Sequence, residues 1–557
     1  MDLEFNSTFS YLQAEFHAEY SRLSAVVYQL GASSVDLLAG LAAVLVTQSA
    51  AVSVFCSKFL LKLLVHLLYN LLVALFIFLC FAIVWRRFCS PLSDIPGPLS
   101  ATFSASLWQL YHIVNGHIEQ ALIKLHDEHG KFVRIGYNEV SICDPAAIRE
   151  VLMSHMDKGP TYAIFSMPDK RYVNQMAERS CQNHMRKARN LAPGYSFSNI
   201  IKTEPYIDTA LGTLRRQLTA LGDHKKPVDF SQWFNFLAFD ILGEATFSKP
   251  FGFLDSGRDI GNTVKNNVFL RIYISVLGHF PWAHDFLLAN PMIGFFNLTP
   301  AMHVFDTCVA AIDARSKNTE VRMDMLEQWK QQLKAHPERM EEIEILTNAV
   351  GNLGAGGDTV SSVLQAFVYY VMHDRELLHM LRKELDEASL SDIPTYDETQ
   401  RLPVLQACIK ETYRFHTPVG FGLTRISPSP DGVTVAGRHF PSGTILSVNP
   451  WVIHRIKSLF GQDAREFNPR RWLNDLWRAK EMDRVMIPFG AGYNGCPGRH
   501  LAHLEVSKTA AMMIREFHVR LVEEGSEWKY ENYFTVAPHG WPCFVRRRSK
   551  RRKEMKR

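Results

Sequence analysis

One cysteine near the C-terminus stands in a glycine-rich stretch, Phe489-Gly490-Ala491-Gly492-Tyr493-Asn494-Gly495-Cys496-Pro497-Gly498. The glycines allow a tight turn that leaves backbone N–H groups near the sulfur. Pro497 suits the first position of a helix, whose dipole would stabilise a thiolate at this end. We therefore predict that Cys496 is a metal ligand. A haem iron fits this arrangement, because an anionic sulfur ligand favours O–O cleavage.

An inert cysteine buried in a turn is the alternative interpretation, since free cysteines are among the most buried residues. The wider pattern argues against it. Phe-Gly-x-Gly-x-x-x-Cys-x-Gly resembles the haem-binding signature of the cytochrome P450 monooxygenases, and three further motifs of that family occur in the family's order across about residues 95–545. The resemblance implies a mainly α fold with small β-sheets, a helix-rich triangular prism around haem b. Cys496 would be the axial iron ligand, with Phe489 and Gly490 beside the cofactor.

The composition excludes some functions. The chain has 557 residues, 47% of them hydrophobic, and can bury a large core in one or several domains. Residues 546–557 carry a local charge of +8, and subtracting it from the total of +5 leaves −3 for the remainder, so we expect no nucleic-acid partner. The nine cysteines are scattered, without zinc pairs or a disulfide framework, which indicates a reducing compartment.

Two apolar runs, 37–57 and 63–85, are each long enough to cross a bilayer, for which about 20 helical residues suffice. The second ends in Trp85-Arg86-Arg87, and the positive-inside rule then places the following domain in the cytosol. The first run is a second span or a helix on the membrane surface, while two buried helices of a soluble core are the remaining alternative. We predict an anchor in the lipid bilayer of the endoplasmic reticulum, with one or two spans.

These features divide the chain into five parts. A proline-rich stretch after the anchor resembles the hinge of microsomal family members. The basic tail could be a nuclear signal, but beside an anchor we favour an arm that is disordered or rests on anionic lipid. The parts are an N-terminal segment (1–35), a membrane anchor (36–87), the hinge (88–100), a haem-thiolate catalytic domain (101–545) and the tail (546–557).

The segment 341–373 is helix-like although it holds four glycines, each of which costs about 1 kcal/mol against alanine within a helix. Its stretch Ala355-Gly356-Gly357-Asp358-Thr359 resembles the family's Ala/Gly-Gly-x-Asp/Glu-Thr motif. The resemblance implies a groove of small residues that admits O2, with Asp358 and Thr359 relaying protons through water. A helix kink with both side chains facing solvent is the alternative.

Glu411 and Arg414 stand at positions i and i+3, where a surface ion pair would contribute little. They resemble the family's Glu-x-x-Arg. Downstream, Phe467-Asn468-Pro469-Arg470-Arg471-Trp472 resembles its Phe-x-Pro-x-Arg-Trp/Phe element. The resemblance implies that Glu411, Arg414 and Arg471 form one buried, structural network that fastens the haem-side loop.

Arg425 stands at the family's position for binding a haem propionate. Two other propionate positions are weakened, because Ala188 follows His184 where the family carries an arginine and Asn494 replaces an arginine before the cysteine. We therefore expect Arg425 to contribute more of the propionate binding than it does in relatives that keep all contacts.

A basic cluster at 184–189 offers substitutes for the missing contacts. Arg189, or alternatively Arg186, would bind a propionate, although such a cluster is usually a solvated helix face. His454 is interpreted as a structural histidine and not as a second iron ligand.

Short strands are predicted at 133–137 and 140–143, and again at 433–436 and 444–448, where a Pro-Ser-Gly turn separates two strands of a small sheet. Helices dominate between these two regions. By resemblance, the substrate pocket draws on four segments that are largely aromatic and aliphatic: 162–167, 269–296, 419–424 and 534–539.

The motifs together predict a monooxygenase that inserts one atom of O2 into an apolar small molecule. Electrons would come from NADPH through a separate NADPH-cytochrome P450 reductase, because no nucleotide- or flavin-binding segment remains in the chain. His184 in place of tryptophan resembles fungal secondary-metabolism members of the pisatin demethylase type. One alternative is an O2-independent haem-thiolate isomerase or dehydratase, a group that tends to lose the Asp-Thr pair. Another is a membrane haem sensor or electron carrier.

Overall fold

The computed structural model describes residues 34–104, 106–166, 170–288, 302–317 and 322–548, with isolated residues between 14 and 28 and between 290 and 296. Contacts divide the chain into two units, Met1–Val84 and Trp85–Arg557. Most of the predicted N-terminal segment therefore lies outside the described residues.

The first unit is built on helix α2 (Ser34–Val84), which has 51 residues. Except for Trp85, both apolar runs belong to this one helix, with Lys58 and Lys62 between them. At about 1.5 Å per residue it is roughly 76 Å long, more than twice the hydrocarbon thickness of about 30 Å. By length and composition, the stretch from Leu38 to Cys89 can cross a membrane.

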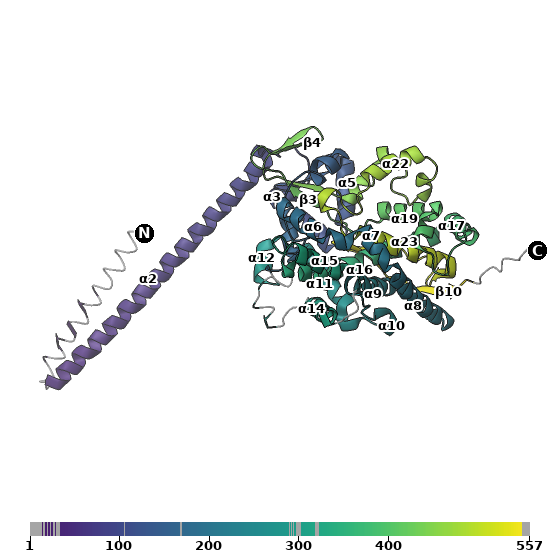
Figure 1. Ribbon diagram of the computed structural model, residues 1–557. Coiled ribbons are helices and arrows are strands. Elements are labelled where there is room, and N and C mark those ends of the chain that lie inside the picture. The colour runs from purple at the N-terminus through teal and green to yellow at the C-terminus, as the bar shows by residue number, and fades with distance from the viewer. Residues whose placement is uncertain are drawn as a thin grey trace, which may run out of the picture. The chain divides into compact units, whose positions relative to one another are not determined.

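The second unit is organised around α16 (Glu342–His373), which lies against α9, α23 and α19 (Figure 1). Two of its glycines have a packing role, because a Cβ on Gly356 would meet Leu242 at 2.6 Å and one on Gly357 would meet Phe239 at 2.8 Å. Both partners belong to α9 (Phe230–Phe247), a helix buried along most of its length. The glycines thus let two helices approach closely.

The unit contains further helices. In chain order they are η1 (Trp85–Cys89), α3 (Leu99–Phe103), α4 (Leu107–Val114), α5 (Ile118–His129), η2 (Ile148–Leu152), η3 (Pro160–Phe165), α6 (Cys181–Tyr195), α7 (Phe197–Ile200), η4 (Ile201–Thr203), α8 (Glu204–Asp223), α10 (Phe253–Ser256), η5 (Ile260–Asn262), α11 (Thr263–Leu277), α12 (Pro281–Phe286), α14 (Met302–Lys317), α15 (Met325–Ala335), α17 (Arg375–Glu387), α18 (Tyr396–Gln400), α19 (Pro403–Phe415), α20 (Pro450–Ile453), α21 (Lys457–Phe460), η6 (Pro469–Trp472), α22 (Leu476–Val485), η7 (Gly492–Asn494) and α23 (Arg499–Glu516). Of these helices, α8, α10, α14, α15, α17, α19 and α23 contact α16 or α9.

The main sheet has four strands in the order β1-β2-β6-β3. Strands β1 (Phe132–Gly136) and β2 (Glu139–Ile142) are antiparallel and lie within one residue of the predicted pair. Strand β6 (Ile445–Val448) runs parallel to β2 and antiparallel to β3 (Leu423–Ile426). Since β3 carries Arg425, this sheet positions one of the predicted site residues.

The prediction that 433–436 and 444–448 form one small sheet is wrong. Strand β4 (Val433–Val435) pairs instead with β5 (Arg438–Phe440), while 445–448 is β6 of the main sheet. The cause is a two-residue turn in which Ala436 and Gly437 adopt φ values of 48° and 83°. Such a turn joins hairpin strands, but Ala-Gly lacks the usual Asn-Gly or Asp-Gly signature.

Two further two-stranded antiparallel sheets complete the unit: β7 (Phe517–Leu521) pairs with β10 (Cys543–Arg547), and β8 (Lys529–Tyr533) pairs with β9 (Thr535–His539). Strand β10 thus includes the start of the predicted basic tail. Arg548 also contacts the body, since its Nη2 donates to Asp386 at 2.7 Å. The folded body extends three residues past the expected boundary at 545, and 549–557 lie outside the described residues.

The hinge lies against β1. The Arg134 N–H donates to the Pro96 carbonyl at 2.8 Å, and a Cβ on Gly97 would stand 2.1 Å from the Arg134 oxygen. Asp94 pairs with Arg438 at 2.5 Å. These contacts fix a proline-rich segment that cannot form a helix or sheet of its own.

Candidate functional site

The loop around Cys496 is closed by its own backbone. The Cys496 N–H donates to the Phe489 carbonyl at 2.7 Å, and Gly490 and Gly492 have φ values of 70° and 66°, which favour glycine. Helix α23 begins at Arg499. The tight turn into a helix is therefore present, although Pro497 precedes the helix and does not occupy its first position.

The environment of the Cys496 sulfur combines burial with access. Burial raises the pKa of the thiol, whereas the N–H groups of Gly498 and Arg499 and the charge of Arg499 lower it. The Cys496 residue is nevertheless exposed. Both observations hold for a sulfur that lies deep in the unit but faces open space.

An open space also borders α16. Gly354 and Ala355 are exposed, although the helix runs through the core, and a Cβ on Gly354 would meet nothing within 4 Å. Among the described residues, no group of three or more His, Cys, Asp or Glu side chains could hold a bare metal ion. Haem iron takes four ligands from its porphyrin, so that one protein thiol suffices to bind it. The single thiol and the open spaces fit such a flat group.

Asp358 and Thr359 lie next to these residues on α16. Asp358 is buried and forms an ion pair with Nε of Arg271, on α11, at 3.4 Å. Burial raises the pKa of Asp358, and the charge of Arg271 lowers it. The Thr359 hydroxyl donates to the Ala355 carbonyl at 2.9 Å. The Asp358 carboxyl is thus held inside the unit and does not face bulk solvent.

The structure brings Glu411, Arg414 and Arg471 together. Arg414 is fully buried and donates to both carboxylate oxygens of Glu411, at 2.9 and 2.8 Å. Nε of Arg471 donates to the same carboxylate at 3.1 Å, and the Trp472 indole N–H donates to it at 2.9 Å. Arg414 also donates to the carbonyl of His454 at 2.8 Å, so that this network ties α19 to the segment before the cysteine loop.

His454 lies next to this network. Its Nδ1 is 3.1 Å from the Thr417 hydroxyl, and its Nε2 accepts from the Ile487 N–H at 3.0 Å. Burial lowers the pKa of His454 to about 3. Both ring nitrogens are engaged, as the structural interpretation of this residue requires.

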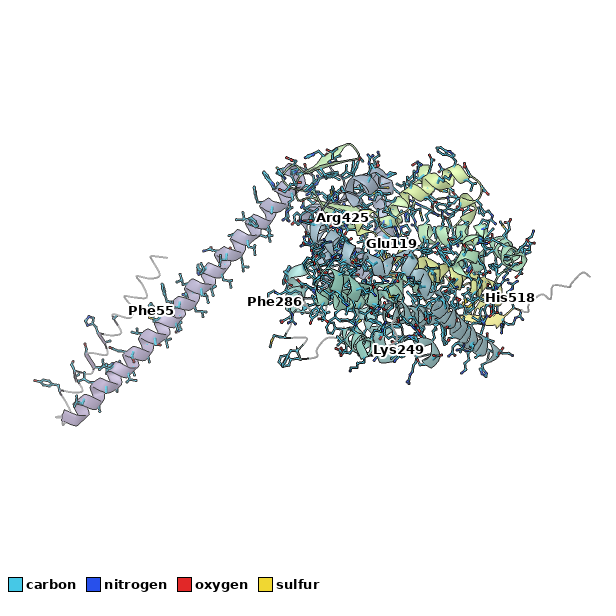
Figure 2. All side chains as sticks on the ribbon, viewed as in Figure 1. Phe55, Glu119, Lys249, Phe286, Arg425 and His518 are labelled. Atoms are coloured by element: carbon cyan, nitrogen blue, oxygen red, sulfur yellow. The ribbon has the colours of Figure 1, made fainter. Side chains whose placement is uncertain are left out.

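The predicted anion-binding residues are not all together. Arg425, labelled in Figure 2, is buried on β3, and its Nε has no hydrogen-bond partner. Asn494 is close to the cysteine, and both its amide atoms are buried without a partner. Arg189, in contrast, is exposed and stands about 140° around α6 from His184, at 3.6 residues per turn. Arg186 is engaged by Glu344 at 2.8 Å.

Lys158 is a buried basic residue that sequence reasoning missed. Its Nζ donates to the carbonyls of Gln175 and Met176 at 2.9 and 3.1 Å, and it lies 3.0 Å from Nδ1 of His184. Its backbone forms an antiparallel bridge with Arg425. Burial and the charge of Arg425 lower the pKa of Lys158 to about 7. No motif marks this position in the sequence. Since lysine is seldom buried, nothing in the sequence indicates that it lies inside the protein.

The predicted pocket segments meet in space. The Phe534 ring contacts Phe165 and Phe421, with centroids 5.0 and 6.0 Å apart. A Cβ on Gly278 would stand 2.6 Å from Thr161, so the segment after α11 also reaches this region. Residues 167–169 and parts of 289–301 lie outside the described residues. A separate surface cleft of about 250 Å³, lined by Ser458, Leu459, Asp475, Trp477, Arg478, Glu481 and Met482, shares no residue with these segments.

Glu505 is a buried carboxyl group on α23, the helix that follows the cysteine loop. Burial raises its pKa from 4.5 to about 8, and its Oε1 has no hydrogen-bond partner. Between these two pH values the folded chain holds a proton that the unfolded chain has lost, so the free energy of unfolding falls as the pH rises.

We expect Glu505→Gln to remove this pH dependence and to be more stable than the wild type at pH 8. Thermal unfolding at pH 5 and pH 8 measures the effect, with the exposed Glu523→Gln as the control. A variant that loses stability in parallel with the wild type would contradict the assignment.

The chain is similar to known proteins over most of its length. The family model for cytochrome P450 matches residues 95–540. The cytochrome P450 monooxygenase cicH of Emericella nidulans is 31% identical over 462 residues, which cover 80% of this chain and 92% of that protein. The cytochrome P450 monooxygenase gsfF of Penicillium aethiopicum is 30% identical over 480 residues, covering 82% and 94%. A cytochrome P450 monooxygenase of Aspergillus terreus is 30% identical over 459 residues, covering 79% and 92%.

The helix-rich unit, the cysteine loop and these relatives define an oxidoreductase that uses molecular oxygen. The chain belongs to the cytochrome P450 family. The resemblance drawn from the motifs is thereby confirmed, as is the mainly α fold with small sheets. Membership of this family implies a cysteine-ligated haem, a small-molecule substrate and a redox partner.

Proposed function

We propose that the protein is a haem-thiolate monooxygenase in which Cys496 ligates the iron of haem b, and in which one atom of O2 enters an apolar secondary metabolite while the other becomes water. The observation that carries the proposal is the Cys496 sulfur, which lies deep in the unit yet is accessible. When bound, the haem would activate O2 and oxidise the substrate.

The chain's own residues would hold the thiolate and move protons. The N–H groups of Gly498 and Arg499 would stabilise the negative sulfur. Gly354 and Ala355 leave room beside α16 for a small molecule such as O2. The Asp358 carboxyl, whose pKa is raised by burial, would pass protons through water to the neighbouring Thr359 hydroxyl and from there to the O2-binding space.

The network of Glu411, Arg414 and Arg471 would have a structural role. It joins α19 to the segment before the cysteine loop, and so would hold the loop in place for the cofactor. The aromatic contacts of Phe534 with Phe165 and Phe421 support an apolar substrate, because such rings bind apolar surface.

In the cell, the protein would be bound to a membrane and would receive its electrons from a partner protein. Helix α2 would anchor the protein in the membrane of the endoplasmic reticulum, with the catalytic unit in the cytosol. NADPH would supply electrons through a separate NADPH-cytochrome P450 reductase. The names of the relatives support a monooxygenase, and the organisms named with them support a fungal type of pathway.

The experiment reconstitutes the full chain with a reductase and NADPH, offers a panel of apolar aromatic metabolites, and supplies isotopically labelled O2. We expect products that carry one labelled oxygen atom, with NADPH consumed in proportion. Products that form without the label would instead support an isomerase or dehydratase, and haem reduction without any product would support an electron carrier.

A further inference from the structure

The basic side chains at 158 and 425 form a cluster without an acidic partner. Lys158 and Arg425 are exposed by only 3% and 2%, and their backbones are bridged to each other. Gly159 permits this approach, because a Cβ there would stand 2.2 Å from the Thr424 hydroxyl oxygen. No ion pair joins Lys158 or Arg425 to a carboxylate in the part of the chain that the structure describes. Buried charges in proteins are normally paired.

Two acidic groups of this region are engaged by other partners. Glu178 lies 3.6 Å from Nζ of Lys187, and the Asp157 carboxylate accepts from the Cys181 N–H at 2.8 Å. Nζ of Lys158 contacts backbone carbonyl oxygens and the ring of His184. Nε of Arg425 has no hydrogen-bond partner. Two buried basic groups therefore have no acidic partner among the described residues, and an anion from outside the protein would favour the charged form of Lys158, whose pKa is lowered to about 7.

The contacts of His184 connect this cluster to the cysteine loop. Its Nε2 is 3.2 Å from the Tyr493 carbonyl, three residues before Cys496. Its Nδ1 lies 3.0 Å from the Lys158 Nζ and 3.0 Å from the Gln175 carbonyl oxygen, so the ring bridges the basic cluster and the cysteine loop. Burial and the Lys158 charge lower the pKa of His184 to about 4, so the ring is neutral. Nearby, both amide atoms of Asn494 are buried without a partner.

We propose that Lys158 and Arg425, with His184 and Asn494, form the pole that binds the carboxylates of the haem, and that Lys158 replaces the arginine contacts missing at positions 188 and 494. Lys158 acts through its charge, which adds to that of Arg425 and which a bound carboxylate would favour. The inference rests on the proposed function, since it needs a haem at Cys496. It assigns to Lys158 the role that the sequence suggested for Arg189.

The chain offers a matched control. Lys187 is also a buried lysine, on the same helix as His184, and its Nζ donates to the Val173 carbonyl at 2.6 Å. Unlike Lys158, it has an acidic partner, Glu178. Replacing either lysine by methionine removes one buried charge and keeps an unbranched side chain that is one atom shorter. Only the replacement of Lys158 should weaken the binding of an anion from outside the protein.

The experiment measures the rate at which haem leaves the purified holoprotein for an excess of apomyoglobin, and the midpoint potential of the iron. We expect Lys158→Met to lose haem about tenfold faster than the wild type, the effect of losing a charged hydrogen-bonding partner. We also expect its midpoint potential to become more negative, because a positive charge near the iron is gone. Lys187→Met should stay within about twofold of the wild type, and Lys158→Arg should restore most of the retention.

Equal haem loss from Lys158→Met and Lys187→Met, with an unchanged potential, would overturn the inference. If Lys158→Met does not fold, the same comparison between Lys158→Arg and Lys158→Gln decides, since only the former keeps the charge. Failure of the proposed function would look different, because the wild type itself would then hold no thiolate-ligated haem.

Discussion

Replacing Glu411 by alanine is expected to give protein that retains no haem. The Glu411 carboxylate accepts hydrogen bonds from Arg414, Arg471 and Trp472, and it is completely buried. Removing it would leave the Arg414 guanidinium charged and unpaired in the core. Breaking a buried ion pair in this way costs about 3–5 kcal/mol of folding free energy. The haem-to-protein ratio of the purified variant measures the effect.

A surface glutamate is the control for Glu411. Glu387 lies 4.0 Å from Lys383, with about two thirds of each side chain exposed, and such pairs contribute at most about 1 kcal/mol. Glu387→Ala should therefore bind haem as the wild type does. A normal haem ratio in Glu411→Ala would refute the structural role of the network.

The second large effect is expected at the proton relay. Thr359→Val and Asp358→Asn should each lower the rate of product formation by about 100-fold, the smaller end of the range for proton transfer by a positioned side chain. NADPH consumption should fall much less, with the difference released as hydrogen peroxide, because O2 is then reduced without reaching the substrate. Product, NADPH and peroxide are measured in the same reaction.

Thr347 is a matched control on the same helix. Its hydroxyl donates to the Glu344 carbonyl at 3.1 Å, as that of Thr359 donates to the Ala355 carbonyl, but it is fully enclosed. Thr347→Val removes the same atoms and should keep NADPH consumption coupled to product. Coupling that stays intact in Thr359→Val, or is lost equally in Thr347→Val, would count against the relay.

The parts of the fold that local patterns determine could be predicted. Helix α16 begins within one residue of the expected 341, and β1 and β2 were found to within one residue. The cysteine loop was also recognisable, since its glycines mark positive φ values at Gly490 and Gly492. Each of these features depends on the backbone preferences of neighbouring residues.

The parts of the fold and of the site that depend on contacts between distant residues could not be predicted. The hairpin of β4 and β5 turns at Ala436 and Gly437, a pair with weak turn preference, so its pairing was assigned to the wrong strand. Lys158 is buried where its Nζ donates to the carbonyls of residues 175 and 176, which lie outside the range of a local sequence pattern. From sequence, a basic residue on a helix beside His184 was the more natural partner, and Arg189 proved to face outward.

The central claim is that the sulfur of Cys496 binds haem iron, and a carbon monoxide difference spectrum of the reduced, full-length protein tests it most directly. We predict the red-shifted Soret band of a thiolate-ligated haem in the wild type, and its disappearance in Cys496→Ser. A wild type that lacks this band, or a Cys496→Ser variant that keeps it, would contradict the account.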